Sequence, residues 1–132
     1  MLGIIKSYLK KAKQEAQKDY LIPSKEKAWI GVDLDGTLAF YDMNSPMINI
    51  GRPIPLMVKR VKAMVDKGYR VKVFTARAQD SDQVLLIRNW LKKNGLPPLE
   101  ITNIKDYNMI KLFDDRAVQV ELNTGKLIKA EE

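Results

Sequence analysis

Two pairs of aspartates directly follow apolar segments of this sequence. The segment 29–32 is followed by Asp33 and Asp35, and a second apolar segment is followed by Asp114 and Asp115. Carboxylates this close together ionise cheaply only when a cation or a shared proton offsets their charge. Carboxylate oxygens are also the ligands that hard cations such as Mg²⁺ prefer. The two pairs therefore indicate a metal site or a pair of acid–base groups.

The first pair lies in the stretch Asp33-Leu-Asp-Gly-Thr, which also suits an aspartate turn or a calcium-binding loop. A calcium loop requires a third acid and a glutamate beyond its glycine, and the sequence lacks both at those positions. A buried strand is also expected directly before the pair, which argues further against calcium. The simple turn is left open by the first pair alone, and an exposed turn explains Asp114 and Asp115 equally well when that pair is considered alone.

Two other polar groups lie between the acid pairs and also follow apolar segments. Thr75 comes directly after the segment 69–74, and Lys105 comes soon after Ile101. Taken singly, the threonine is more typical of a cap or turn, and the lysine is more typical of exposed surface. Taken together, two acid pairs, a hydroxyl and an ammonium outline a site for a hard cation and phosphoryl oxygens.

Strands and helices must alternate for these groups to meet. The periodicity of apolar residues predicts helices over 55–67 and 81–93, the second with Asp80 or Ser81 as its N-cap. It predicts strands over 29–33, 69–74 and 109–113, a short strand at Ile101, and a strand over 118–122 before a hairpin-like end. This alternation is typical of an α/β fold with a mainly parallel sheet, in which ligands bind beyond the carboxyl ends of the strands. The polar groups should therefore lie at one edge of the sheet.

Composition excludes several kinds of chemistry. The chain has 132 residues, which suits one domain, and contains neither cysteine nor histidine. Disulfides, thiolate metal sites and cysteine nucleophiles are therefore excluded, as are imidazole bases and ligands. Catalysis has to rely on carboxylates, lysine, hydroxyls and a hard cation.

The N-terminal residues 1–27 differ from the rest of the chain. They hold seven lysines and three acidic residues, so they supply +4 of the net charge of +7. Helical spacing over 2–20 predicts a basic amphipathic helix followed by a linker. We expect this helix either to be exposed to solvent or to form a contact between subunits of a homo-oligomer. No apolar run is long enough to cross a membrane, and we expect a cytoplasmic protein without a membrane partner.

The site residues, in their order along the chain, resemble the four motifs of the haloacid dehalogenase superfamily of aspartyl-nucleophile phosphohydrolases. The stretch 33–37 is similar to the first motif, Thr75 to the second, Lys105 to the third and the pair at 114–115 to the fourth. The likeness covers roughly residues 28–122, and the stretches 102–106 and 113–120 are similar to small uncharacterised members from phages and bacteria. It implies a three-layer Rossmann-like domain over 28–132. A receiver domain has its acid pair and acceptor aspartate in a different order, and no nucleotide-kinase phosphate loop is present.

The resemblance implies a magnesium-dependent phosphatase. Asp33 is then the nucleophile, and Asp35 protonates the leaving group and later activates water. The expected holders of Mg²⁺ are Asp33, the backbone carbonyl of Asp35, and Asp115, with Asp114 supporting the metal. Which of Asp114 and Asp115 contacts the metal directly is left open.

The resemblance also implies groups that hold the phosphate. Thr75 and nearby backbone N–H groups such as that of Ala76 are expected to bind phosphoryl oxygens. Lys105 is expected to neutralise charge, with Lys111 as its competitor inside the following strand. Arg77 and Arg116, which follow two of the motifs, either bind an anion or form ion pairs with Asp114 or Asp106.

The gaps between the motifs bear on the substrate. In this superfamily, cap domains that close over small substrates are inserted after the first motif or between the second and third. Neither gap has room for a cap here, so we expect an open site, with Tyr41, Met43, Met47 and Arg52 as candidate flap residues. An open site suits a phosphorylated substrate of unknown size, and a nucleotide or nucleic-acid end is one option. The alternative function is a non-catalytic module that binds Mg²⁺ and phosphate.

Overall fold

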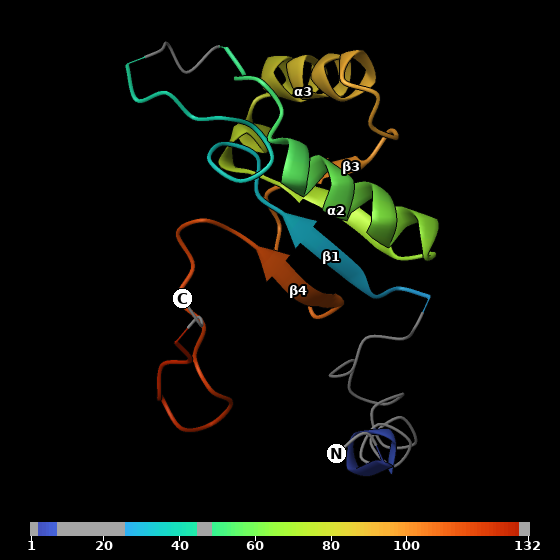
Figure 1. Cartoon of the computed structure of the whole chain (residues 1–132), viewed down its shortest axis with the longest axis vertical. Helices are drawn as coiled ribbons and strands as arrows, with labels where there is room; N and C mark the ends of the chain where they lie inside the picture. The colour runs from blue at the N-terminus through green and yellow to red at the C-terminus, as the bar shows by residue number, and fades with distance from the viewer. Residues whose placement is uncertain (1–2, 8–25, 45–48, 130–132) are drawn as a thin grey trace.

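The computed structural model describes residues 3–7, 26–44 and 49–129. Its centre is a sheet of four parallel strands in the order β3-β2-β1-β4 (Figure 1). The strands are β1 (Trp29–Val32), β2 (Arg70–Phe74), β3 (Glu100–Thr102) and β4 (Met109–Phe113). The α/β class and the parallel sheet that the sequence predicts are therefore confirmed, and the four predicted strands that form this sheet have boundaries within two residues of the observed ones.

Two α-helices connect these strands. Helix α2 (Pro55–Asp66) has proline in its first turn and ends just before Gly68, whose φ is +90°. Helix α3 (Ser81–Lys93) begins at the N-cap Asp80, whose side chain accepts a hydrogen bond from the backbone N–H of Asp82. A short 3₁₀ helix, η1 (Ala76–Gln79), lies between β2 and α3 and was not expected from the sequence.

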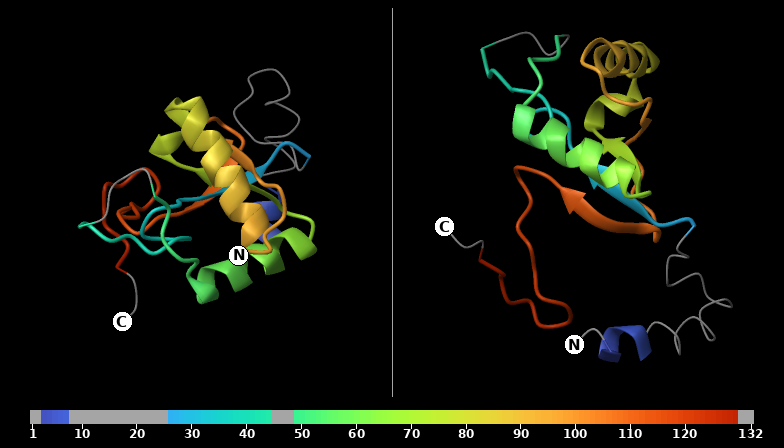
Figure 2. Two further views of the ribbon diagram at one scale, coloured as in Figure 1. Left: turned by 90° about the horizontal axis from the view of Figure 1, so that it is seen from above. Right: turned by 45° about the vertical axis from the view of Figure 1, so that its right-hand side comes forward.

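Both helices lie on the same face of the sheet. One hydrophobic cluster joins alternate residues of β1 and β2 to residues of both helices: Ile30, Val32, Val71, Val73, Val61, Ile87, Trp90 and Leu91. This arrangement follows from topology, because two successive right-handed crossovers in the same direction place their helices on one side. The views in Figure 2 show the helices from two further directions.

The opposite face carries a separate group of side chains. The ring of Trp29 lies 6.3 Å from that of Phe74, and the ammonium of Lys72 lies 4.4 Å from the Trp29 ring. These residues alternate along β1 and β2 with those of the hydrophobic cluster, so they point to the other face. Among the residues that the structure describes, no helix covers this face. The helical layer that would complete a three-layer domain is therefore not part of the described fold.

The chain after β4 departs from the sequence prediction. Residues 118–122 do not join the sheet; an isolated antiparallel bridge pairs Val120 with Leu127 and forms the hairpin-like end. This segment lies apart from the sheet and helices in Figures 1 and 2, and its apolar residues are exposed, Leu122 at 83%. The predicted strand has the right alternation, but it has no partner in the sheet.

The N-terminal prediction is mostly beyond what the structure describes. Residues 3–7 are helical, as the predicted helix over 2–20 requires, and the rest of that helix lies outside the described residues. In the described part of the chain, no helix has the length and apolar character needed to span a membrane.

Candidate active site

The two acid pairs meet at the carboxyl edge of the sheet. Strand β1 pairs in parallel with β4, and Val32 lies opposite Phe113. Just beyond this pair, the backbone N–H of Asp33 donates a 2.9 Å hydrogen bond to the carbonyl of Phe113. The main chain therefore sets Asp33 beside Asp114, as the sequence predicts for adjacent parallel strands.

Three carboxylates form a cluster there. Asp33, Asp114 and Asp115 each offer an oxygen that lies within 4.8 Å of those of the other two. Hard oxygen donors at this spacing fit a divalent cation such as Mg²⁺. Asp35 was predicted to bind the metal through its backbone carbonyl, and its carboxylate is not part of this cluster.

Thr37 bridges the cluster, a role that the sequence analysis did not assign. Its hydroxyl donates to Asp115 Oδ1 at 2.9 Å and accepts from the backbone N–H of Asp115 at 3.0 Å, while Asp33 Oδ2 lies 3.4 Å away. The turn after β1 places it there, because the carbonyl of Leu34 accepts bonds from the N–H groups of Leu38 and Ala39. Its position four residues after Asp33 within this turn was the available signal.

Gly36 brings the turn and Asp115 together. Its φ is +89°, and a Cβ at this position would lie 2.8 Å from Asp115 Oδ2. Only glycine combines this backbone conformation with so close an approach of a neighbouring carboxylate. The close approach of Asp115 therefore explains why a glycine occupies position 36.

The cluster changes the acidity of its members. Burial raises the pKa of Asp33 from 3.8 to about 7, helped by a hydrogen bond shared with Asp115 and by the charges of Asp114 and Asp115. Burial also opposes ionisation of Asp115, but the Thr37 hydroxyl and the bond with Asp33 outweigh it and hold the pKa of Asp115 below its usual value. One proton is thus readily held between the two carboxyl groups, unless a cation takes its place.

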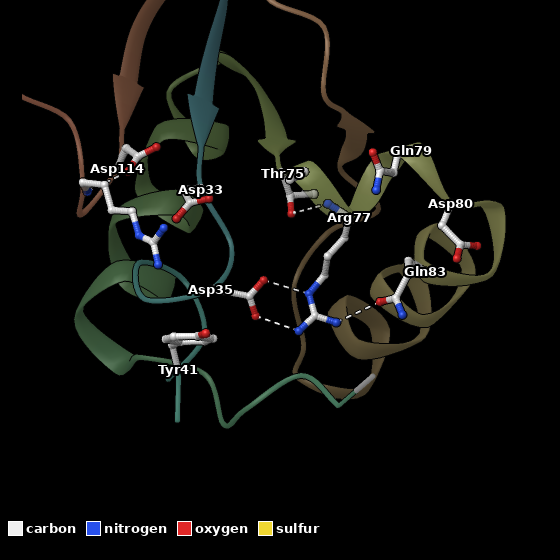
Figure 3. A pocket seen from close by; sticks show the side chains of 11 residues that line it. Asp33, Asp35, Tyr41, Thr75, Arg77, Gln79, Asp80, Gln83 and Asp114 are labelled. Atoms are coloured by element: carbon white, nitrogen blue, oxygen red, sulfur yellow. Dashed lines mark hydrogen bonds and ion pairs between the residues drawn. The ribbon is translucent and has the colours of Figure 1, made fainter. Parts of the chain in front are cut away.

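Asp35 points away from the cluster towards Arg77 (Figure 3). The guanidinium donates from Nε to Asp35 Oδ2 at 2.7 Å and from Nη2 to Asp35 Oδ1 at 2.9 Å. Of the two interpretations of Arg77 from the sequence, an ion pair is therefore confirmed. Its partner is Asp35 rather than Asp114 or Asp106, and Asp106 accepts instead from the indole of Trp29.

Thr75 caps the short helix η1, which was the simpler of its two interpretations. Its hydroxyl oxygen accepts a 3.2 Å hydrogen bond from the backbone N–H of Arg77, and its side chain is buried. Accepting this bond uses a lone pair and leaves the hydroxyl proton to be donated. Thr75 also lines the pocket that contains the acids, so the cap and a ligand contact are compatible.

A pocket of about 370 Å³ joins these groups. Its lining consists of Asp33, Asp35, Tyr41, Thr75, Ala76, Arg77, Gln79, Asp80, Gln83, Asp114 and Arg116 (Figure 3). Lys105 and Lys111 are both exposed, and neither belongs to this lining. The structure therefore does not bring the predicted charge-neutralising lysine to the acids, whereas Arg116 is there.

Comparisons with known proteins give the fold but no family. No family model matches the chain, and no curated protein matches it. A solved structure of a conserved protein from Bacteroides thetaiotaomicron is similar, with a TM-score of 0.53 and 21% identity over 67% of this chain and 76% of that chain. A likeness at this identity supports the α/β fold alone.

The acidity of Asp33 predicts how stability depends on pH. Between pH 3.8 and about 7 the folded protein, without a cation, binds a proton at Asp33 that the unfolded chain has already released. The free energy of unfolding contributed by this group therefore falls as pH rises through that window. Urea unfolding in EDTA should show this fall in the wild type, relative to Asp33→Asn, which lacks the titrating group.

The exposed acid Asp66 at the end of α2 provides the control, because Asp66→Asn removes the same charge away from the cluster. Its pH profile should run parallel to that of the wild type. If the Asp33→Asn profile also ran parallel to the wild type, the raised pKa of Asp33 would be contradicted.

Proposed function

We propose that the chain is a magnesium-dependent phosphomonoester hydrolase of the haloacid dehalogenase type, with a Rossmann-like domain that lacks a cap. The observation that carries this proposal is the cluster of Asp33, Asp114 and Asp115, of which Asp33 and Asp114 line the same pocket as Thr75. The similarity of the motif order to that superfamily supports the same reading.

The charge balance of the pocket supports a need for a cation. Acids line the pocket at Asp33, Asp35, Asp80 and Asp114, whereas its basic residues are Arg77 and Arg116. Because Arg77 is already paired with Asp35, little positive charge is left to attract a phosphate dianion. A divalent cation held by the acid cluster would offset this repulsion and stabilise charge on the transferring group.

Asp33 suits the role of nucleophile. It is half-buried at the end of a rigid strand, so its carboxylate has one defined position beside the cluster. Attack by an Asp33 oxygen on phosphorus would break the bond to the leaving oxygen and form an aspartyl phosphate, and attack by water on that phosphorus would then release phosphate and regenerate Asp33. With a cation bound, Asp33 would be ionised at neutral pH despite its burial.

The remaining roles follow from position in the pocket. Asp35 lies two residues on and would give a proton to the leaving oxygen and later take one from water. The Thr75 hydroxyl and the Ala76 backbone N–H, at the start of η1, would donate to phosphoryl oxygens. Arg116 is the cation best placed to assist them, and a role for Lys105 stays a prediction that would require movement of its exposed segment.

The pocket also bears on the leaving group. Apart from Arg116 and the ion-paired Arg77, the other residues that line the pocket beside the acids include Tyr41, Gln79, Asp80 and Gln83, which are uncharged or acidic. Amide and hydroxyl groups suit a polar leaving group that carries hydroxyls or a ring, and the aspartate disfavours a polyanion. We therefore favour a small polar phosphomonoester over the end of a nucleic acid.

The nucleophile is tested by Asp33→Asn, which removes the attacking oxygen at little cost to the fold. We expect magnesium-dependent hydrolysis of an aryl phosphate to fall by more than about 1,000-fold, as when a catalytic nucleophile is lost. Asp66→Asn again provides the charge-matched control and should keep wild-type activity. Undiminished turnover by Asp33→Asn would overturn the assignment. Binding of Mg²⁺ by a wild type that hydrolyses no phosphate ester would favour the non-catalytic module.

The metal site is tested at Gly36, which has a matched control elsewhere in the chain. Gly36 and Gly68 have φ of +89° and +90°, but a Cβ at Gly68 would meet nothing within 4 Å. Both Gly→Ala variants should lose about 1 kcal/mol of stability through backbone strain. Only Gly36→Ala should also push Asp115 aside and weaken Mg²⁺ binding at least tenfold, as measured by the Mg²⁺ dependence of Tm. Equal Mg²⁺ responses in the two variants would contradict the site.

A further inference from the structure

We propose that Arg77 is a positioning residue that holds Asp35 in the orientation needed to protonate the leaving group. The inference rests on the proposed function, because it concerns the acid of that reaction. In this role Arg77 binds the carboxylate of Asp35 and not the substrate phosphate, which is the other partner that the sequence allows.

The hydrogen bonds of Arg77 support this assignment. Beyond its two bonds to Asp35, Nη1 donates to Gln83 Oε1 at 2.8 Å and Nη2 donates to the carbonyl of Asn49 at 3.1 Å. A guanidinium has five N–H groups, so four are used and at most one is left for a ligand. Arg77 therefore lacks the two free N–H groups that it would need to bind a phosphate through a pair of hydrogen bonds.

The surroundings of Arg77 make it a rigid support. Arg77 is buried, and its partners come from three places: the turn after β1, the segment before α2, and helix α3. Asp35 is the more exposed member of the pair, with a side-chain exposure of 20% against 6% for Arg77. These contacts fix the guanidinium of Arg77, which therefore holds the Asp35 carboxylate in one position at the wall of the pocket.

A fixed position matters because Asp35 has no other anchor among the side-chain hydrogen bonds of the described residues. Without Arg77, its side chain is free to rotate away from the leaving oxygen, and proton transfer requires hydrogen-bond distance in the transition state. Lysine at this position keeps the charge but not the two-pronged geometry that fixes both oxygens. Loss of Arg77 should therefore resemble loss of the acid itself.

Leaving-group dependence distinguishes this role from general structural support. A p-nitrophenolate departs without protonation, whereas an alkoxide needs an acid. We expect Arg77→Ala and Asp35→Asn to lower kcat/KM for an alkyl phosphate by about 100-fold or more, and for p-nitrophenyl phosphate by less than about tenfold. Arg77→Lys should fall between wild type and Arg77→Ala on the alkyl substrate. The double variant should lose little more than Asp35→Asn alone.

Arg70 on β2 offers a matched control, because its guanidinium also pairs with a carboxylate, that of Glu100, but outside the pocket. Arg70→Ala should leave both activities unchanged. Arg77→Lys keeps a buried cation, so it preserves the test if Arg77→Ala does not fold. Equal losses on both substrates in Arg77→Lys, or additive losses in the double variant, would overturn the positioning role alone. Absence of turnover in the wild type would instead overturn the proposed function, and this role with it.

Discussion

The arrangement of the site depends on the pairing of β1 with β4. The hydrogen bond from Asp33 N–H to the Phe113 carbonyl places two acidic segments, far apart in sequence, at the same end of the sheet. Thr37 donates a hydrogen bond to Asp115, while burial first, and then the neighbouring carboxyl groups, raise the pKa of Asp33. The fold supplies the energy that holds like charges together, through the packing of β1 and β2 against α2 and α3. A cation bound between these carboxylates would reduce the electrostatic free energy by which their clustering destabilises the folded protein.

The second half of the pocket follows from β2. Where this strand ends, Thr75 starts η1, and the short helix turns Arg77 back towards the β1 turn. The two aspartates of the first motif therefore have separate environments, Asp33 beside other acids and Asp35 against a guanidinium. Separate environments of this kind are what allow neighbouring carboxyl groups to take different roles in one reaction.

Much of this was accessible from the sequence, and the failures have physical causes. Apolar periodicity located the helices and the parallel strands, because burial of alternate residues or of one helix face leaves a direct pattern. The convergence of Asp33 and Asp114 followed from the rule on strand ends. The partner of Arg77 did not, because Asp35 lies beyond the strand, in a turn whose direction no periodicity encodes. The segment 118–122 alternates like a strand, but pairing also requires a neighbour, which the pattern cannot supply. Lys105 was chosen by its order in the chain, and order does not determine where an exposed loop carries a side chain.

The most direct test of the account is whether phosphate becomes bound to Asp33 during turnover. The wild-type protein would be mixed with Mg²⁺ and a phosphate ester labelled in its phosphoryl group, quenched in acid within milliseconds, and digested for mass spectrometry. The account predicts an acid-stable, hydroxylamine-sensitive phosphoryl group on Asp33, and none on any residue of Asp33→Asn. Turnover without labelled protein, or with the label on another residue, would contradict it.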